Sequence, residues 1–157
     1  MLMWPSFAGS DTTAIALRSI FFHLLKNPDT YEKAVAEARS ANVSSDLATY
    51  SESLEMHYVQ ACIKEGLRMQ PAVGMLLERI VPSEGMNLNG VHVPAGTIIG
   101  INPWVAARDT NAYGADADEF RPERWLEASP EKLKLMERNF LAVSLCGLSV
   151  DIQLMVF

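Results

Sequence analysis

Candidate chemistry begins near the start of the chain, where an acid stands beside two alcohols in a run Ala-Gly-Ser-Asp-Thr-Thr that starts at Ala8. Asp11 and Thr12 could form a short relay that carries protons from solvent to a bound reactive group. The small pair Ala8 and Gly9 would let a flat ligand lie against the helix backbone. Glycine inside a helix costs ~1 kcal/mol relative to alanine, so its presence needs a reason. The alternative is that Ser10 caps a helix that begins here and the run has no chemical role.

A second group consists of Glu65 and Arg68, which lie three residues apart and are neighbours on a helix. Most such pairs are solvated and contribute ~0 to 1 kcal/mol. Apolar neighbours such as Cys62 predict a buried pair here, and a buried carboxylate needs more than one donor. Arg124, in the run Phe-Arg-Pro-Glu-Arg-Trp that ends at Trp125, is the second arginine that we expect to reach Glu65. The alternative is an ordinary surface loop.

The elements that must position these groups are helices in the first half of the chain. Apolar residues at helical spacing predict helices over residues 8–26 and 28–40, the second starting with Pro28. Thr49 and Glu52 have capping-box spacing, so a third helix is expected from there to residue 69, before Pro71.

The second half changes character after Pro71. Asn89-Gly90 is a strong hairpin signal, and a further turn at residues 94–96 predicts one small antiparallel sheet within residues 75–101. A short helix over residues 102–108, an ordered loop over 109–125 and a last helix over 129–136 follow. The fold class is therefore mainly α with a small antiparallel β-sheet.

Composition narrows the class of function. The 157 residues carry 13 Lys plus Arg against 19 Asp plus Glu, a net charge of −6, which argues against a nucleic-acid partner. With 49% hydrophobic residues the chain can form a core. Two cysteines cannot form a secreted disulfide framework, so a reducing compartment is expected. No apolar run reaches the ~20 residues that span a bilayer, so no membrane segment is expected within this chain.

Four motifs in this order resemble the C-terminal half of the cytochromes P450, the haem-thiolate monooxygenases, of eukaryotic, fungal type. They are the runs over residues 8–13, 64–71, 93–97 and 120–125. The resemblance covers roughly residues 7–142 and implies a partial cytochrome P450 fold, with residues 1–142 as a partial domain and residues 75–101 as the sheet whose first strand lines the substrate pocket.

The resemblance also implies a role for each candidate residue. Asp11 and Thr12 would be the acid and the alcohol that assist oxygen activation. Arg79 would bond a haem propionate. The distal haem surface would be formed by Ala8 and Gly9, and the structural triad by Glu65, Arg68 and Arg124.

Cofactor and partners follow from the same resemblance. The intact family binds haem, iron protoporphyrin IX, receives electrons from an NAD(P)H-dependent reductase and inserts one oxygen atom of O2 into a small organic substrate. Intact relatives are membrane-associated at the endoplasmic reticulum.

The sequence departs from the family where the cysteine loop, FxxGxRxCxG, should begin after residue 142. Cys146 lies only three residues after Val143, the position where the Phe should stand, and the Arg and second Gly are missing. Cys146 is therefore only a weak candidate for the iron ligand, and the sequence assigns no metal ligand. A second departure is Ala107 before Arg108-Asp109, where the family commonly has a His.

These departures shape the functional expectation. Val143-Ser144 is what translation would read from a splice donor site, so residues 143–157 are interpreted as an aberrant tail of intron read-through. The chain is expected to be a fragment of a haem-dependent monooxygenase that is inactive alone and whose binding of haem is in doubt. The alternative is a non-catalytic helical remnant or interaction surface without cofactor. An unrelated hydrolase is a poor alternative, because this sequence contains no nucleophile-elbow motif.

Overall fold

The computed structural model describes residues 3–142, with side chains from residue 9 onward. The helices of the first half are α1 Met3–Lys26, α2 Pro28–Ser40, α3 Tyr50–Leu54 and α4 His57–Met69. The strands are β1 Leu77–Ile80, β2 Met86–Leu88, β3 Val91–Val93 and β4 Ile98–Ile101. The remaining helices are α5 Pro103–Ala106, α6 Thr110–Tyr113, α7 Arg124–Glu127 and α8 Pro130–Arg138. The predicted fold class, mainly α with a small antiparallel β component, is confirmed.

The helix expected from Thr49 to residue 69 is in fact two helices. The capping box at Thr49 is present, since its side chain accepts from the Glu52 amide and the Glu52 side chain accepts from the Thr49 amide. The helix ends at Leu54, and Met56 precedes α4 with a non-helical ψ of 75°. Glu37 of α2 then accepts hydrogen bonds from the first amides of α4, which gives the new helix a capping partner that lies far away in the sequence.

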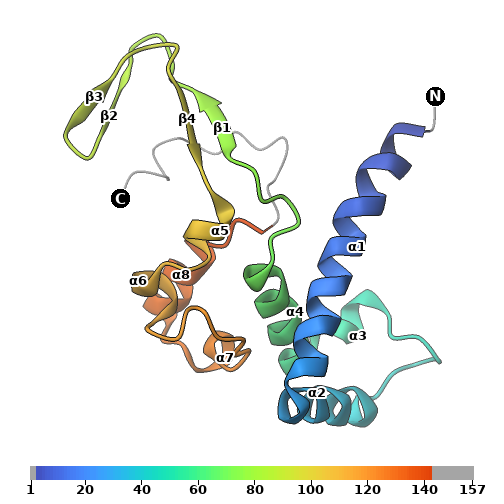
Figure 1. Ribbon diagram of the computed structural model, residues 1–157. Coiled ribbons are helices and arrows are strands. Elements are labelled where there is room, and N and C mark those ends of the chain that lie inside the picture. The colour runs from blue at the N-terminus through green and yellow to red at the C-terminus, as the bar shows by residue number, and fades with distance from the viewer. Residues whose placement is uncertain (1–2, 143–157) are drawn as a thin grey trace.

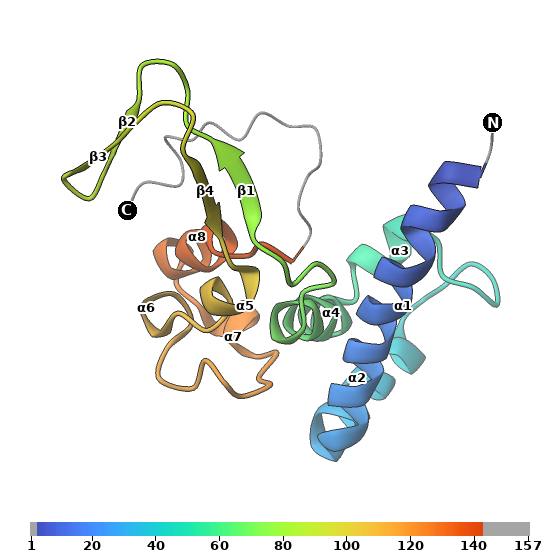
Figure 2. The ribbon, with the colours of Figure 1, turned by 45° about the horizontal axis from the view of Figure 1, so that its top comes forward.

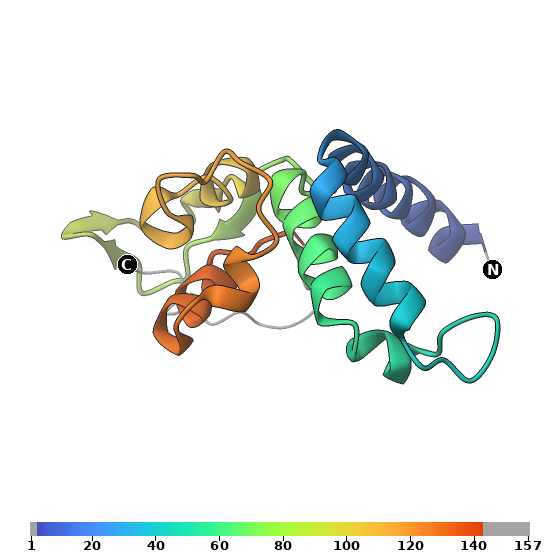
Figure 3. The same ribbon diagram turned by 90° about the horizontal axis from the view of Figure 1, so that it is seen from below.

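Close contact between α1 and α4 depends on a glycine. A Cβ atom at Gly66 would lie 2.7 Å from Ile20 Cγ1, so the two helices meet where one lacks a side chain. The buried Ser19 hydroxyl donates to the Gly66 carbonyl oxygen at 2.7 Å. Figure 3 shows α1, α2 and α4 packed as a group beside the second half of the chain.

The expected single sheet is two separate two-stranded sheets. Strand β1 pairs with β4, and β2 pairs with β3, both antiparallel. Asn89 and Gly90 connect β2 to β3 with φ values of 49° and 82°, which is the left-handed backbone of a tight hairpin turn. Figure 1 shows this hairpin projecting from the end of the β1–β4 pair, away from the helices.

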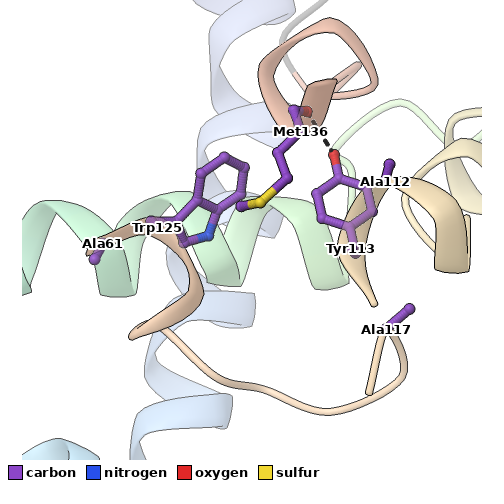
Figure 4. Packing of buried hydrophobic residues seen from close by; sticks show 6 residues of the cluster. All are labelled: Ala61, Ala112, Tyr113, Ala117, Trp125 and Met136. Atoms are coloured by element: carbon purple, nitrogen blue, oxygen red, sulfur yellow. Dashed lines mark hydrogen bonds between the residues drawn. The ribbon is translucent and has the colours of Figure 1, made fainter. Parts of the chain in front are cut away.

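The main apolar cluster lies between α4 and the short helices of the second half of the chain (Figure 4). It consists of Ala61, Ala112, Tyr113, Ala117, Trp125 and Met136. The Tyr113 hydroxyl donates to the Met136 carbonyl oxygen at 3.0 Å, which satisfies the one polar atom of that ring. The predicted loop over residues 109–125 contains α6 and the start of α7, and the cluster holds both against α8. Within residues 3–142, no helix has the length and apolar character that crossing a bilayer requires.

Candidate functional site: a buried charge cluster and a separate helix face

The Glu65 carboxylate is completely buried on α4, one turn before the equally buried Arg68. Arg68 Nε donates to Glu65 Oε2 and Arg68 Nη2 to Glu65 Oε1, both at 2.9 Å. The pair is therefore a two-point contact of the guanidinium and carboxylate planes, which is stronger and more directional than a single bond. It differs from the solvated i,i+3 pair that spacing alone would suggest.

Arg124 reaches the same carboxylate from α7. Its Nε donates to Glu65 Oε1 at 2.8 Å, so the predicted contact is present. The buried ring of Pro122 and the buried Trp125 fix the loop on both sides of Arg124. Two guanidinium groups, one from α4 and one from α7, thus converge on one buried anion, and Arg124 lies 59 positions after Glu65 in the sequence.

Two further donors complete the shell around Glu65, and the sequence did not reveal either. The indole Nε1 of Trp125 donates to Oε2 at 2.8 Å, and the backbone N–H of Arg121 donates to Oε1 at 3.0 Å. For the indole donor, the only signal in the sequence was that residue 125 is Trp, which carries an N–H, and not another apolar residue. A backbone donor leaves no trace in residue types. Both carboxylate oxygens therefore have more than one donor, as a buried charge requires.

The outward edges of the two guanidinium groups donate to acceptors that lie between the end of α5 and the start of α7. Arg68 Nη1 donates to the carbonyl oxygens of Ala107 and Ala117 at 2.6 and 2.7 Å. Arg124 Nη1 donates to the Tyr113 carbonyl oxygen and to Asp116 Oδ1, at 2.6 and 3.1 Å. Asp116 also supplies the second negative charge that balances the two arginines. Among residues whose side chains are described, no buried side-chain nitrogen or oxygen lacks a partner.

The electrostatics follow from these contacts. Burial by itself would raise the pKa of Glu65, but the bonds and charge of Arg68, the Arg121 amide and the charge of Arg124 outweigh it and lower that pKa below 4.5. For Asp116 burial again acts upward, and the Arg124 contacts bring its pKa below 3.8. Burial lowers the pKa of Arg124, whereas Glu65 and Asp116 raise it above its usual value. Glu65, Asp116 and Arg124 are thus held in their charged forms.

A more exposed contact ties the same loop to α2. Glu123 Oε1 accepts from Lys33 Nζ and from the Tyr58 hydroxyl, both at 2.8 Å. The Lys33 side chain is 57% exposed, so this pair is screened by water in a way that the Glu65 pairs are not. It connects α2, α4 and α7 at the rim of the buried cluster.

The residues of the possible proton relay lie apart from this cluster. Gly9 and Asp11 are exposed on α1, and Thr12 is half-buried on the same helix. Ala8 lies in α1, but its side chain is outside the described part of the chain. Figures 1 and 2 show the first half of α1 extending away from the second half of the chain.

Arg79 is half-buried in β1, on another element again. Its Nη1 donates to the Glu78 carbonyl oxygen at 2.7 Å. The structure therefore brings Glu65, Arg68 and Arg124 together, and places Arg79 and the α1 residues at separate positions.

The cysteines and histidines offer no ready metal ligand. Cys62 is 1% exposed, and burial, with smaller effects of the Glu123 and Glu37 charges, raises the pKa of its thiol to about 12. Cys146 lies outside the described residues. No group of three or more His, Cys, Asp or Glu side chains within the described region could hold a metal ion.

Comparison with known proteins agrees with the motif order. A family model for cytochrome P450 matches residues 4–141. The cytochrome P450 monooxygenase cicH of Emericella nidulans is 42% identical over 137 residues, which is 85% of this chain and 27% of that protein. A cytochrome P450 monooxygenase of Aspergillus terreus is 43% identical over 137 residues, 85% of this chain and 28% of that protein. The monooxygenase mfmA of Annulohypoxylon moriforme is 40% identical over 134 residues, 85% of this chain and 26% of that protein.

The chain belongs to the cytochrome P450 family. It spans about a quarter of the length of the curated relatives that it matches, 27% and 28% for the first two. The family implies haem as cofactor, and its iron takes a thiolate ligand. The described residues do not supply that ligand. The Cys62 thiol of α4 is buried, and burial raises its pKa to about 12, so it stays protonated and out of reach of an iron atom.

Proposed function

We propose that this chain is part of a haem-dependent monooxygenase and that, by itself, it is catalytically silent. The observation that carries the proposal is the buried Glu65 cluster, assembled from α4 and α7 in a chain that matches the cytochrome P450 family over residues 4–141. Such a cluster fixes the loop that follows α6 against α4 and so gives the second half of the chain one defined shape. The longer protein would act on a small organic substrate with electrons from an NAD(P)H-dependent reductase.

Within that longer protein each candidate residue has its own task. Asp11, exposed to water, would exchange protons with solvent, and Thr12 beside it would pass them inward. Gly9 and Ala8 would leave room on α1 for a flat ring system. Arg79 would hold a carboxylate group of the cofactor by charge. The buried triad would position the scaffold.

Catalytic silence of this chain rests on its iron ligand. The described residues offer no accessible thiolate, and the tail over residues 143–157, proposed as an aberrant segment, departs from the cysteine-loop pattern. Comparison of the transcript with the genomic sequence tests the origin of the tail. A spliced message that joins residue 142 directly to a Phe-x-x-Gly loop supports read-through, and continuous coding through residue 157 contradicts it.

Two spectroscopic measurements test the proposal for the chain itself. Reduced protein treated with haem and carbon monoxide should not develop the Soret band of a thiolate-ligated haem. Appearance of that band would overturn catalytic silence. A haem titration supports retained cofactor affinity if binding is saturable and stoichiometric.

The second candidate is a helical remnant without cofactor that acts as an interaction surface. One observation favours it: Leu17, Phe21 and Leu25 form an exposed apolar stripe on α1, and Leu25 is 70% exposed. Weak, non-saturable haem absorbance in the same titration would support this candidate over the first.

A further inference from the structure

The β2–β3 hairpin carries the one Asn-Gly pair of the chain. Asn89 is followed by Gly90, whereas every other asparagine is followed by Pro, Val, Leu, Ala or Phe. Glycine has no side chain to shield its amide nitrogen, so that nitrogen can approach the side-chain carbonyl carbon of a preceding asparagine. The pair formed the turn that the sequence predicted, and neither proposed function uses it.

The structure leaves this pair open to solvent. Asn89 and Gly90 are both exposed, and a Cβ atom added at Gly90 would meet no atom within 4 Å. Figure 2 shows the turn at the far end of the hairpin, on the opposite side of the molecule from α1.

The hairpin is also held by few interactions. Strands β2 and β3 have three residues each, and they pair only with one another, apart from the β1–β4 sheet. An isolated two-stranded hairpin is marginally stable in water, and such segments open at low free energy. Opening releases Asn89 from its φ of 49° and lets the Gly90 nitrogen reach the Asn89 side chain.

We propose that Asn89 is a site of spontaneous deamidation. The Gly90 backbone nitrogen gives up its proton and bonds to the Asn89 Cγ atom, and the bond from Cγ to the side-chain nitrogen breaks, so that this nitrogen leaves as ammonia. Water then opens the resulting five-membered succinimide at either carbonyl and yields aspartate or isoaspartate. The net reaction consumes one water molecule, releases one ammonia and involves no oxidation.

The product would change the hairpin and leave the charge cluster intact. Isoaspartate adds one carbon atom to the backbone, which disturbs the pairing of Leu88 with Val91, and either product adds one negative charge. Because β2–β3 is a separate sheet from β1–β4, the disturbance has no strand ladder through which to reach β1.

Incubation of the full 157-residue chain at mildly alkaline pH, followed by peptide mass spectrometry, tests the proposal. The amide-to-acid mass change should accumulate at Asn89 several-fold faster than at Asn42 and Asn111, which are exposed but precede Val and Ala. An isoaspartyl methyltransferase with labelled methyl donor should label the aged chain and should not label an aged Asn89→Gly variant, whose Gly-Gly pair keeps the turn. Conversion at Asn89 no faster than at Asn42 and Asn111 would overturn the proposal.

Discussion

The Glu65 cluster and the first half of α1 hold the two sets of residues that the sequence marked for chemistry. The polar groups of the first are buried and hydrogen-bonded within the chain, whereas Asp11 of the second is exposed to solvent. Every donor that Glu65 needs comes from within residues 65–125. By contrast, Asp11 is exposed on a helix whose apolar stripe includes Phe21, itself 58% exposed. We infer that residues 65–125 supply all the hydrogen-bond partners that the Glu65 cluster requires. The apolar stripe of α1, by contrast, is left exposed by the described residues.

Removal of the central carboxylate should have the largest effect. Glu65→Ala leaves two buried guanidinium groups without their shared anion, and we expect a loss of ~3 to 5 kcal/mol in the free energy of unfolding. Urea denaturation followed by circular dichroism measures it. The control is Glu137→Ala, which breaks the exposed pair with Lys64 and should cost at most ~1 kcal/mol. Equal effects of the two substitutions would remove the distinction between buried and exposed charge.

The indole donor offers a smaller and sharper test. Trp125→Phe keeps an aromatic ring beside Tyr113 and Phe140 but removes the N–H that reaches Glu65, so we expect a loss of ~1 to 3 kcal/mol. Tyr113→Phe is the matched control, because it removes a bond to a neutral acceptor, the Met136 carbonyl oxygen, and should cost ~0.5 to 1.5 kcal/mol. A cost for Trp125→Phe below that of the control would contradict the role of the indole.

Lowering the pH should reduce the difference in the free energy of unfolding between the protein and its Glu65→Gln variant. The pKa of Glu65 is lowered in the folded state from 4.5, so its stabilising contribution is complete above that pH and is lost as pH falls through the folded-state pKa. Gln does not titrate, and Asp116 and Glu123, whose pKa values are also lowered, remain in both proteins. Denaturation at a series of pH values measures the difference. A difference that stays constant below pH 4.5 would be inconsistent with an ionised Glu65.

The relay residue should matter least for stability. Asp11→Asn removes an exposed charge on α1, and we expect a change within ±0.5 kcal/mol by the same denaturation assay. The small change expected here and the large loss expected for Glu65→Ala both follow from the exposure of Asp11 and the burial of Glu65. A large loss would mean that Asp11 has a structural task in this chain.

Much of the scaffold could be predicted from residue types. Pro28 and the Thr49–Glu52 capping box located helix starts, and the Asn89-Gly90 turn was located by its positive φ requirement. Glu65 and Arg68 followed from helix spacing, and the demand of a buried carboxylate for a second donor led to Arg124. Each of these signals is local or follows from one charge that must be balanced.

The parts that could not be predicted depend on tertiary position. The break before α4 is stabilised by Glu37 from another helix, and the Arg121 amide donates to Glu65 only because the loop returns to α4. Pairing of β1 with β4 instead of β2 is a choice among short strands of similar character. Spacing in the sequence carries no information about these contacts.

A carbon-13 NMR titration of the Glu65 side-chain carboxyl tests the central claim most directly. If five N–H groups hold this carboxylate out of water, its chemical shift should stay that of the ionised form as pH is lowered past 4.5, until the chain itself unfolds. A titration midpoint at or above that value in the folded chain would show that Arg68, Arg124 and Trp125 do not hold the group as described.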